Sequence, residues 1–295
     1  MRSRAAFAIG LALVAAAAAW QLALARRWTQ RIPAGWSTTI HYVGTATSPD
    51  PRTGRLPEGA SLENYERTQH VTNDAGRPRW VELEEEYVAR DPVRGRPVFA
   101  YTTRDTVSPQ SGAHADERHR GEIVLFPRDV QRRTYRLRSN YINGIPLTFE
   151  RTEVLEGLQT YLFSYRGRLE QTAAYAGSTG DLGGLRVLAG QEVHCLDDQF
   201  YYRIWVEPAT GEQVKLEEGC PSGDYVFDVS SGRPVMALAR WTGVTAGDDL
   251  IQRIEEIRRL RWHYLLASRY LGITLLAGGA LLTVVGARPR PRTAG

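Results

Sequence analysis

The sequence predicts a mainly β (α+β) protein, in which an antiparallel-sheet extracytoplasmic domain lies between an N-terminal and a C-terminal transmembrane helix. Three observations lead to this fold class: an uncharged apolar run near each end, alternating apolar and polar residues through the middle, and a turn pattern that occurs three times. The sheet is expected to form one unit or two subdomains joined near residues 140–146. The predicted segments are an N-terminal membrane helix (1–27), the β-rich domain (28–246), an amphipathic helix continuing into a second membrane helix (247–287) and a basic tail (288–295).

The first apolar run extends from Ala5 to Ala25 without a charge. As a helix, it would measure about 32 Å, which is enough to cross the hydrocarbon core of a bilayer. The alternative is a cleaved signal peptide, because residues 23–25 read Ala-Leu-Ala. The run is long for a signal peptide and two arginines follow it, so a membrane anchor is the better interpretation.

The central region alternates apolar and polar residues with the period of a β-strand. In the stretch RIWVEPATGEQVKLEEG, Ile204 and Val206 face one side of a strand and Trp205 faces the other. Many similar runs, separated by turn residues, predict an extensive antiparallel sheet. The Gly-rich residues 176–190 are expected to be a connecting loop, with a lid over a cavity as the alternative.

A turn pattern of acid, three residues, glycine, two residues and valine occurs as DPVRGRPV, EPATGEQV and DVSSGRPV. An acidic side chain accepts hydrogen bonds from turn amides, and glycine supplies the positive φ that returns the chain. We therefore interpret Glu207 as a hairpin corner and not as a catalytic carboxylate. The predicted corners pair Asp91 with Gly95, Glu207 with Gly211, and Asp228 with Gly232.

The chain contains two cysteines, Cys195 and Cys220, on either side of the second turn pattern. Outside the cytoplasm such a pair usually forms a disulfide, and closing this loop would contribute about 3 kcal/mol. Two unpaired buried thiols are the alternative.

The C-terminal segment begins as an amphipathic helix, in which Leu250, Ile254 and Ile257 follow a helical period. Thr245 and Asp248 before it resemble a capping box. An uncharged run from residue 270 to 287 and a basic tail come next. The positive-inside rule then places both termini in the cytoplasm and the central domain outside it. A buried core helix is the alternative for this second run.

The distribution of charge argues against a nucleic-acid partner. The net charge is +4, but eight arginines flank the apolar runs: Arg2, Arg4, Arg26, Arg27, Arg269, Arg288, Arg290 and Arg292. The rest of the chain carries more acids than bases, so it offers no basic patch for phosphates.

Sequence motifs of catalysis are missing. HADERH (114–119) matches no standard zinc spacing and is interpreted as a solvated loop. HCLDD (194–198) places a histidine and an acid beside Cys195, whose expected disulfide partner is Cys220. There is no phosphate-binding glycine loop, nucleophile elbow or HExxH motif. We expect neither an enzyme nor a bound cofactor or metal.

Several strand and turn blocks carry a resemblance to a known family. They are Phe126-Pro127, Tyr135, Gly157-Leu158, Tyr161, Phe163 and the block Trp205 to Gly211. These blocks resemble the bacterial porin PorA family of membrane proteins. The resemblance implies a membrane helix at each end of an exported β-rich region, and it transfers no functional residue.

These features favour a membrane-anchored binding protein of the cell envelope. Its expected partners are the lipid bilayer and a lipid or envelope glycolipid, and it could self-associate into a homo-oligomer. A protein–protein scaffold is the first alternative. An oligomeric pore is the second, although the strands are too densely charged for a membrane barrel.

Overall fold

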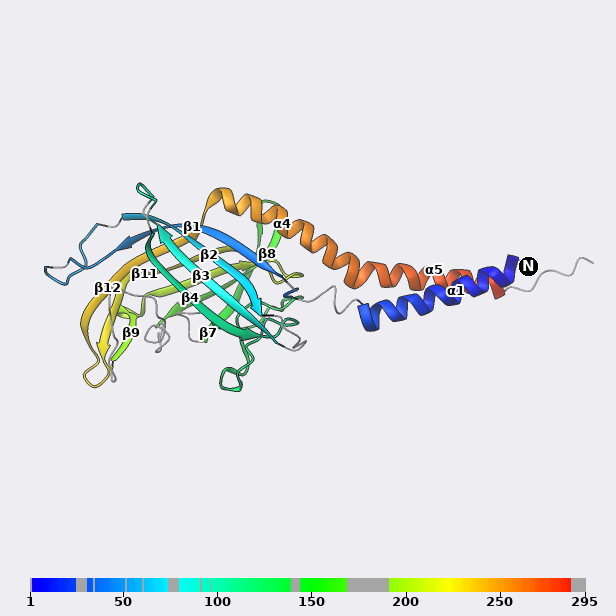
Figure 1. The fold of residues 1–295 in the computed structure, drawn as a ribbon, viewed down its shortest axis with the longest axis horizontal. Coiled ribbons are helices and arrows are strands. Elements are labelled where there is room, and N and C mark those ends of the chain that lie inside the picture. The colour runs from blue at the N-terminus through cyan, green and yellow to red at the C-terminus, as the bar shows by residue number, and fades with distance from the viewer. Residues whose placement is uncertain are drawn as a thin grey trace, which may run out of the picture.

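The computed structural model describes residues 2–24, 31–33, 35–50, 52–59, 61–73, 80–90, 92–95, 97–138, 144–168 and 191–287. The described strands form one twelve-stranded sheet. Figure 1 shows this sheet as a curved body from which two helices project side by side. The predicted fold class is confirmed, and the described strands belong to one sheet.

Helices lie at both ends of the described chain. Helix α1 (Arg2–Ala19) continues into a π-helical turn (Trp20–Leu24). The strands are β1 (Ser37–Thr47), β2 (Ser61–Asn73), β3 (Val81–Arg90), β4 (Pro97–Val107), β5 (Glu122–Ile123), β6 (Tyr135–Leu137), β7 (Ile145–Leu155), β8 (Leu158–Gly167), β9 (Gln191–Cys195), β10 (Phe200–Val206), β11 (Gln213–Asp228) and β12 (Arg233–Thr245). Short 3-10 helices span Glu117–His119 and Leu196–Asp198. Helix α4 (Gly247–Leu265), a π-helical turn (Leu266–Tyr270) and α5 (Leu271–Ala287) follow.

The strand order is β4-β3-β2-β1-β12-β11-β10-β8-β7-β6-β5, and β9 pairs with β11 off this path. Only the short pair of β5 and β6 is parallel among the described strands. The first and last strands of the domain pair with each other, with Val43 opposite Val244. This pairing brings the segments that lead to the two terminal helices onto neighbouring strands.

The part of the outer face formed by β8, β10 and β11 is covered by α4. Ile254 and Ile257 of α4 are buried with Trp205, Leu162 and Val214 in one apolar cluster. Trp205 therefore faces the helix. Its neighbours on β10, Ile204 and Val206, belong to the core on the opposite side of the sheet, as the alternation of a strand requires. Both faces of this part of the sheet are apolar because both are buried.

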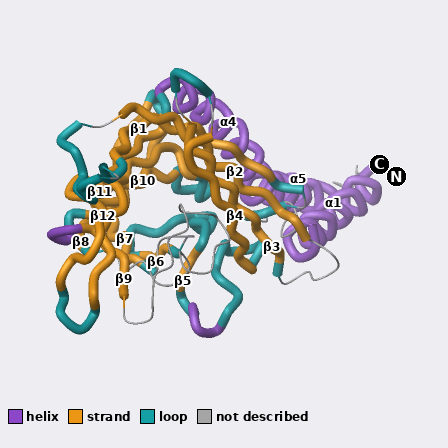
Figure 2. Tube along the Cα trace, turned by 60° about the vertical axis from the view of Figure 1, so that its left-hand side comes forward, coloured by secondary structure: helices purple, strands orange, loops and turns teal. Residues whose placement is uncertain are grey.

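The inner face is covered by the segment between β4 and β6, which Figure 2 shows crossing beneath the arch of the sheet. Phe126 and Val130 from this segment, and Tyr135 at the start of β6, are buried in one cluster with side chains of the longer strands. The rings of Phe126 and Phe163 lie 4.9 Å apart. This core fills the concave side of the sheet with aromatic and aliphatic groups.

The predicted capping box at the start of helix α4 is wrong. Its N-cap is Ala246, and no side chain caps the first turn. The Thr245 hydroxyl instead accepts a hydrogen bond from the Leu216 amide at 2.9 Å within the sheet. Asp249 accepts from the amide of His41 at 2.8 Å. The side chains of Thr245 and Asp249, which could cap the helix locally, therefore bond to β11 and β1 instead.

Helices α1 and α5 pack closely through small residues. A Cβ atom added at Gly10 would lie 2.7 Å from the Gly279 carbonyl oxygen, and one added at Gly279 would lie 2.8 Å from that of Gly10. The Trp20 indole also donates to the Ala267 carbonyl at 2.8 Å. Close backbone approach through glycine is typical of helices that associate in membranes.

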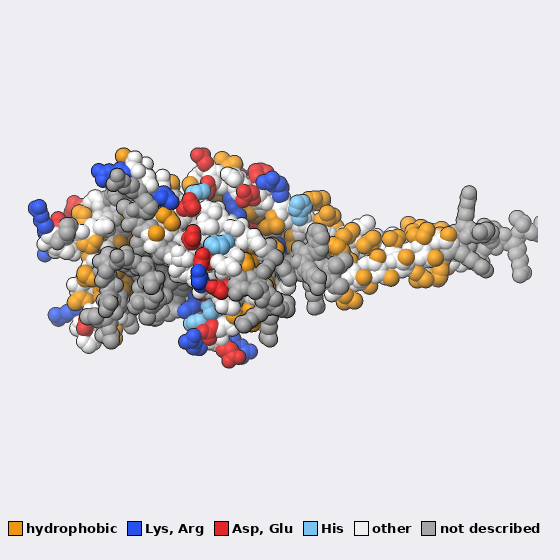
Figure 3. Space-filling view, in the orientation of Figure 1, with side chains coloured by type: hydrophobic (Ala, Val, Ile, Leu, Met, Phe, Trp, Pro, Cys, Tyr) orange, Lys and Arg blue, Asp and Glu red, His pale blue; other side chains and the backbone are white. Residues whose placement is uncertain are grey.

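Two helices, containing Ala5–Leu22 and Gly247–Ala287, are long and apolar enough to cross a membrane. Figure 3 shows mainly hydrophobic side chains along their exposed surfaces. The second helix is continuous from the outer face of the sheet through the π-helical turn to Ala287.

Candidate functional site

The three predicted hairpin corners lie at turns between consecutive strands. Gly95, Gly211 and Gly232 have φ values of 65°, 72° and 63°. These values lie in the left-handed region that glycine adopts without strain. The acid of the first corner, Asp91, lies outside the described residues.

Asp228 organises an exposed turn between β11 and β12. Its Oδ1 atom accepts hydrogen bonds from the Ser231 amide at 2.7 Å and the Ser230 hydroxyl at 2.5 Å. These bonds hold the pKa of Asp228 below its usual value. The Gly232 amide closes the turn on the Asp228 carbonyl at 2.8 Å.

Glu207 makes the same kind of turn, but in a buried place. Its Oε2 atom accepts from the amide and the hydroxyl of Thr210, at 2.7 and 2.8 Å. Its other oxygen lies 3.1 Å from the Arg261 guanidinium on α4. The Glu207 turn is therefore joined by an ion pair to α4, the helix that continues into α5. The Asp228 turn, by contrast, is exposed.

Glu212, next to this corner, joins both membrane-linked segments to the sheet. Arg31, from the segment that follows α1, donates to Oε1 of Glu212 at 2.5 Å, and Arg253 of α4 donates to Oε2 at 2.8 Å. We call Arg31, Glu212 and Arg253 the clamp. Burial would raise the pKa of Glu212, but the charges of the two arginines outweigh it and hold the pKa below its usual value.

Arg31 is held by the turn as well as by the carboxylate. Its Nε donates to the Phe126 carbonyl at 2.8 Å, and Nη2 donates to the Gly211 carbonyl at 3.2 Å. Only 2% of the Arg31 side chain is exposed. A guanidinium buried to this degree requires such a complete set of partners.

Arg253 is similarly anchored, since its Nε donates to the Gln213 carbonyl at 3.1 Å. Further along the same helix, Tyr264 donates to Asp129 at 2.6 Å, and Arg269 donates to the other oxygen of Asp129 at 2.8 Å. Polar contacts thus connect the helix to the sheet and to the loop between β5 and β6 over several turns.

A small cavity with both polar and apolar walls lies beside the clamp on the inner face. Its volume is about 30 Å³, enough for one or two water molecules. It is lined by Arg31, Arg67, Gln69, Glu85, Val124, Leu125, Phe126, Leu137, Tyr202, Ile204, Gly211 and Gln213. Charged residues of both signs therefore line a cavity that the aromatic core surrounds.

Hydrogen bonds organise the cavity walls. Arg67 donates to Gln213 at 2.7 Å, Gln213 donates to the Tyr42 hydroxyl at 2.9 Å, and Gln69 donates to Glu85 at 2.5 Å. Burial raises the pKa of Glu85 despite the nearby charge of Arg67, and burial raises the pKa of Tyr42 to about 12. Buried ionisable groups with shifted pKa values are common in binding sites.

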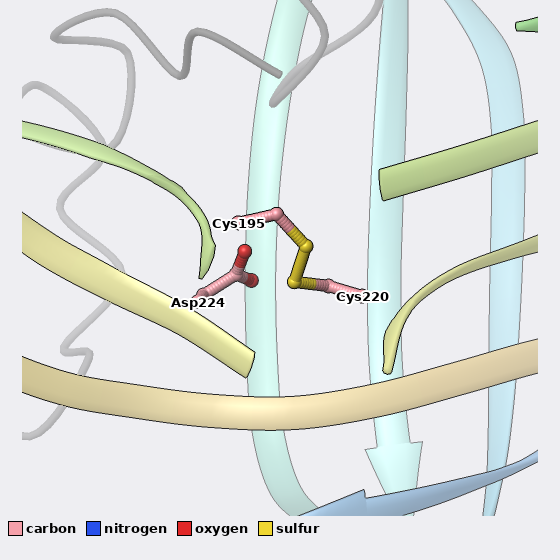
Figure 4. A group of neighbouring side chains, drawn as sticks. All are labelled: Cys195, Cys220 and Asp224. Atoms are coloured by element: carbon pink, nitrogen blue, oxygen red, sulfur yellow. A yellow bond between two sulfur atoms is a disulfide. The ribbon is translucent and has the colours of Figure 1, made fainter. Parts of the chain in front are cut away.

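Cys195 and Cys220 lie at disulfide distance, with their Cα atoms 5.8 Å apart. Figure 4 shows the Asp224 carboxylate beside their sulfur atoms. Burial raises the pKa of Asp224 to about 6, although the Trp241 indole donates to this carboxylate at 2.6 Å. In the HCLDD motif, His194 instead stacks on Phe227, with ring centroids 3.5 Å apart.

The HADERH segment is less solvated than its composition predicts. His114 faces Asp105 at 3.2 Å with 10% of its side chain exposed, and His119 faces Glu122 at 3.4 Å. The two histidine rings are 4.9 Å apart. Pairing with carboxylates on neighbouring segments explains why this segment folds back onto the sheet.

Two long apolar helices beside one large β domain indicate a protein embedded in a membrane. The chain belongs to the Porin PorA family, whose model matches residues 3–288. No curated protein matches the sequence. A solved acyl-CoA hydrolase from Agrobacterium tumefaciens is similar at 13% identity over 81% of this chain and 86% of that chain. Its TM-score of 0.16 is too low to support any argument about fold or activity.

Proposed function

We propose that this chain is a two-pass protein of the cell envelope that binds a lipid or glycolipid through its exported β domain. The role proposed is binding and not catalysis. The observation that carries it is the position of the cavity directly beside the clamp: Arg31 lines the cavity and also bonds to Glu212. A site so close to both membrane-linked segments lies within reach of molecules at the bilayer surface.

The walls of the site suit an amphipathic ligand. Arg67 and Gln213 offer polar groups, whereas Phe126 and Ile204 offer apolar surface. The present volume admits a hydroxyl-sized group and not an acyl chain. The proposal therefore requires the covering segment between β4 and β6 to move away from the sheet when a lipid enters.

A protein–protein scaffold is the second candidate, and one surface favours it. Val229, Val235 and Met236 are exposed around the hairpin between β11 and β12. Grouped exposed apolar residues mark sites of protein association. An oligomeric pore, which the family's name suggests, would need a polar lining, whereas α5 and residues 5–24 carry no charge.

Native mass spectrometry of the full-length protein, released from mild detergent, tests these alternatives. A monomer or dimer with a reproducible lipid mass supports the proposal. A bare monomer favours the scaffold, and a closed ring without lipid favours the pore.

A matched pair of variants tests the site itself. Arg67→Met should reduce the lipid-bound fraction, because it removes the central donor of the cavity. Arg104→Met changes an arginine on β4 whose side chain is 64% exposed, and it should retain lipid as the wild type does. Equal lipid retention by both variants would contradict the proposed location.

A further inference from the structure

A bulge in β11 assembles a second buried site, remote in sequence from the clamp. The register shifts between Cys220, which lies opposite Trp241, and Asp224, which lies opposite Ala239. Gly223 in the bulge has a φ of 98°. On its other edge, Asp224 lies opposite Cys195 of β9. The bulge thereby places the side chains of residues 195, 220 and 224 together.

One carboxylate oxygen of Asp224 accepts no hydrogen bond from the described residues. Its Oδ2 atom accepts from the Trp241 indole at 2.6 Å, whereas the buried Oδ1 has no hydrogen-bond partner within the described part of the chain. Asp224 is 6% exposed, and both cysteines are fully buried. A buried carboxylate oxygen without a partner is costly, so its position beside two sulfur atoms points to a ligand.

We propose that Cys195, Cys220 and Asp224 form a Zn²⁺ site when their disulfide is reduced. Two thiolates and a carboxylate are ligands that Zn²⁺ binds in tetrahedral geometry, with water in the fourth position. One ligand atom from each residue already lies within 4.8 Å of the others. Small side-chain rotations bring such atoms to Zn–S distances of about 2.3 Å and Zn–O distances of about 2.1 Å.

The chemistry requires a dithiol reductant. One of its thiolates attacks a sulfur of the disulfide, and its second thiol then releases the reductant as a cyclic disulfide. The protein gains two electrons and two protons and leaves two cysteine thiols. Zn²⁺ displaces those two protons, and the Asp224 carboxylate completes the protein ligands. The metal then replaces the covalent link at the point where β11 changes its partner from β10 to β9.

Metal binding to the full-length protein in detergent tests the proposal. After reduction has produced two titratable thiols per chain, the wild type should retain about one zinc per chain through gel filtration. The oxidised protein should retain none. Co²⁺ bound to the reduced protein should show thiolate charge-transfer absorption, which reports the sulfur ligands directly. Absence of stoichiometric zinc from the reduced wild type would overturn the proposal.

Asp224→Asn tests the carboxylate, because an amide oxygen still accepts from Trp241. This variant should bind Zn²⁺ roughly tenfold more weakly or worse. The control is Asp198→Asn, at an exposed position with a φ of 51° that asparagine adopts readily. Unchanged zinc affinity in Asp224→Asn, with a wild-type circular dichroism spectrum, would exclude Asp224 as a ligand. The Co²⁺ spectrum of the wild type tests the two thiolates independently of any variant.

Discussion

Glu212 shows how one residue of a repeated turn acquires a separate role. The residue after the glycine is arginine in the other two copies of the pattern, Arg96 and Arg233, and glutamate only here. The change supplies a carboxylate at the point where Arg31 and Arg253 converge. Arg31 is 181 residues away in the sequence, so no local spacing reveals the clamp. The departure from the repeated pattern was the available sequence signal.

Removing the charge of Glu212 should destabilise the fold strongly. Glu212→Gln leaves two buried guanidinium groups without their counter-charge, which typically costs about 3–5 kcal/mol. Denaturation in detergent, followed by tryptophan fluorescence, measures the free energy of unfolding. Glu255→Gln is the control, since this α4 carboxylate is 59% exposed, and its effect should stay within about 0.5 kcal/mol. If Glu212→Gln and Glu255→Gln lowered the free energy of unfolding equally, the clamp would stabilise the fold no more than an exposed ion pair does.

The same carboxylate predicts how stability depends on pH. The folded pKa of Glu212 lies below the usual value of 4.5, so the unfolded chain binds more protons in that interval. The stabilisation is therefore present above about pH 4.5 and is lost as the pH falls through the folded pKa. The difference in unfolding free energy between wild type and Glu212→Gln should shrink when measured from pH 7 down to pH 3. A constant difference would contradict the ionic clamp.

At the scale of elements, strands and hairpins were predictable because their signals are local. Alternation along β10 and the glycines of three turns depend only on neighbouring residues. The pairing of β1 with β12 and the covering of the inner face depend on contacts between distant segments. The capping box failed for the same reason, because Thr245 bonds to β11 instead of to its own helix. Of the candidate sites, the cysteine pair and the Glu207 turn were visible beforehand, whereas the Glu212 clamp and the Asp224 carboxylate were not.

The pair of α1 and α5 offers a sharp test of close helix packing. Gly279→Leu should push the two helices apart by roughly 2 Å, because its side chain would enter the backbone of α1. Spin labels on cysteines at Leu11 and Leu281, which are both exposed, measure the separation. The two native cysteines lie at disulfide distance and fully buried, so they should not be labelled.

The neighbouring glycine gives the matched control. A Cβ atom at Gly278 would meet nothing within 4 Å, so Gly278→Leu should leave the label distance unchanged. If both variants keep the wild-type distance, the small-residue contact between Gly10 and Gly279 does not set the spacing of the helices.

At the scale of the whole molecule, the clamp and the continuous C-terminal helix form one mechanical connection. The 41-residue helix packs on the sheet at one end and lies beside α1 at the other. Arg31 ties the segment after α1 to the same turn that Arg253 reaches from α4. A domain held at two points cannot swing as freely as one on a single tether. In the proposed two-pass topology, the cavity beside the clamp would accordingly keep a fixed height above the bilayer.

The arrangement predicts a defined topology that labelling can test. Because the free ends of α1 and α5 lie at the same end of the helix pair (Figure 1), both termini should lie on one side of the membrane and the β domain on the other. A membrane-impermeant maleimide should label Val229→Cys, a 54% exposed position, in intact cells. It should label Ala294→Cys only after permeabilisation. Labelling of both positions in intact cells would place the C-terminal tail and the β domain on the same side of the membrane. In that case α5 could not span the membrane, and the clamp would hold the domain to a helix pair outside the bilayer.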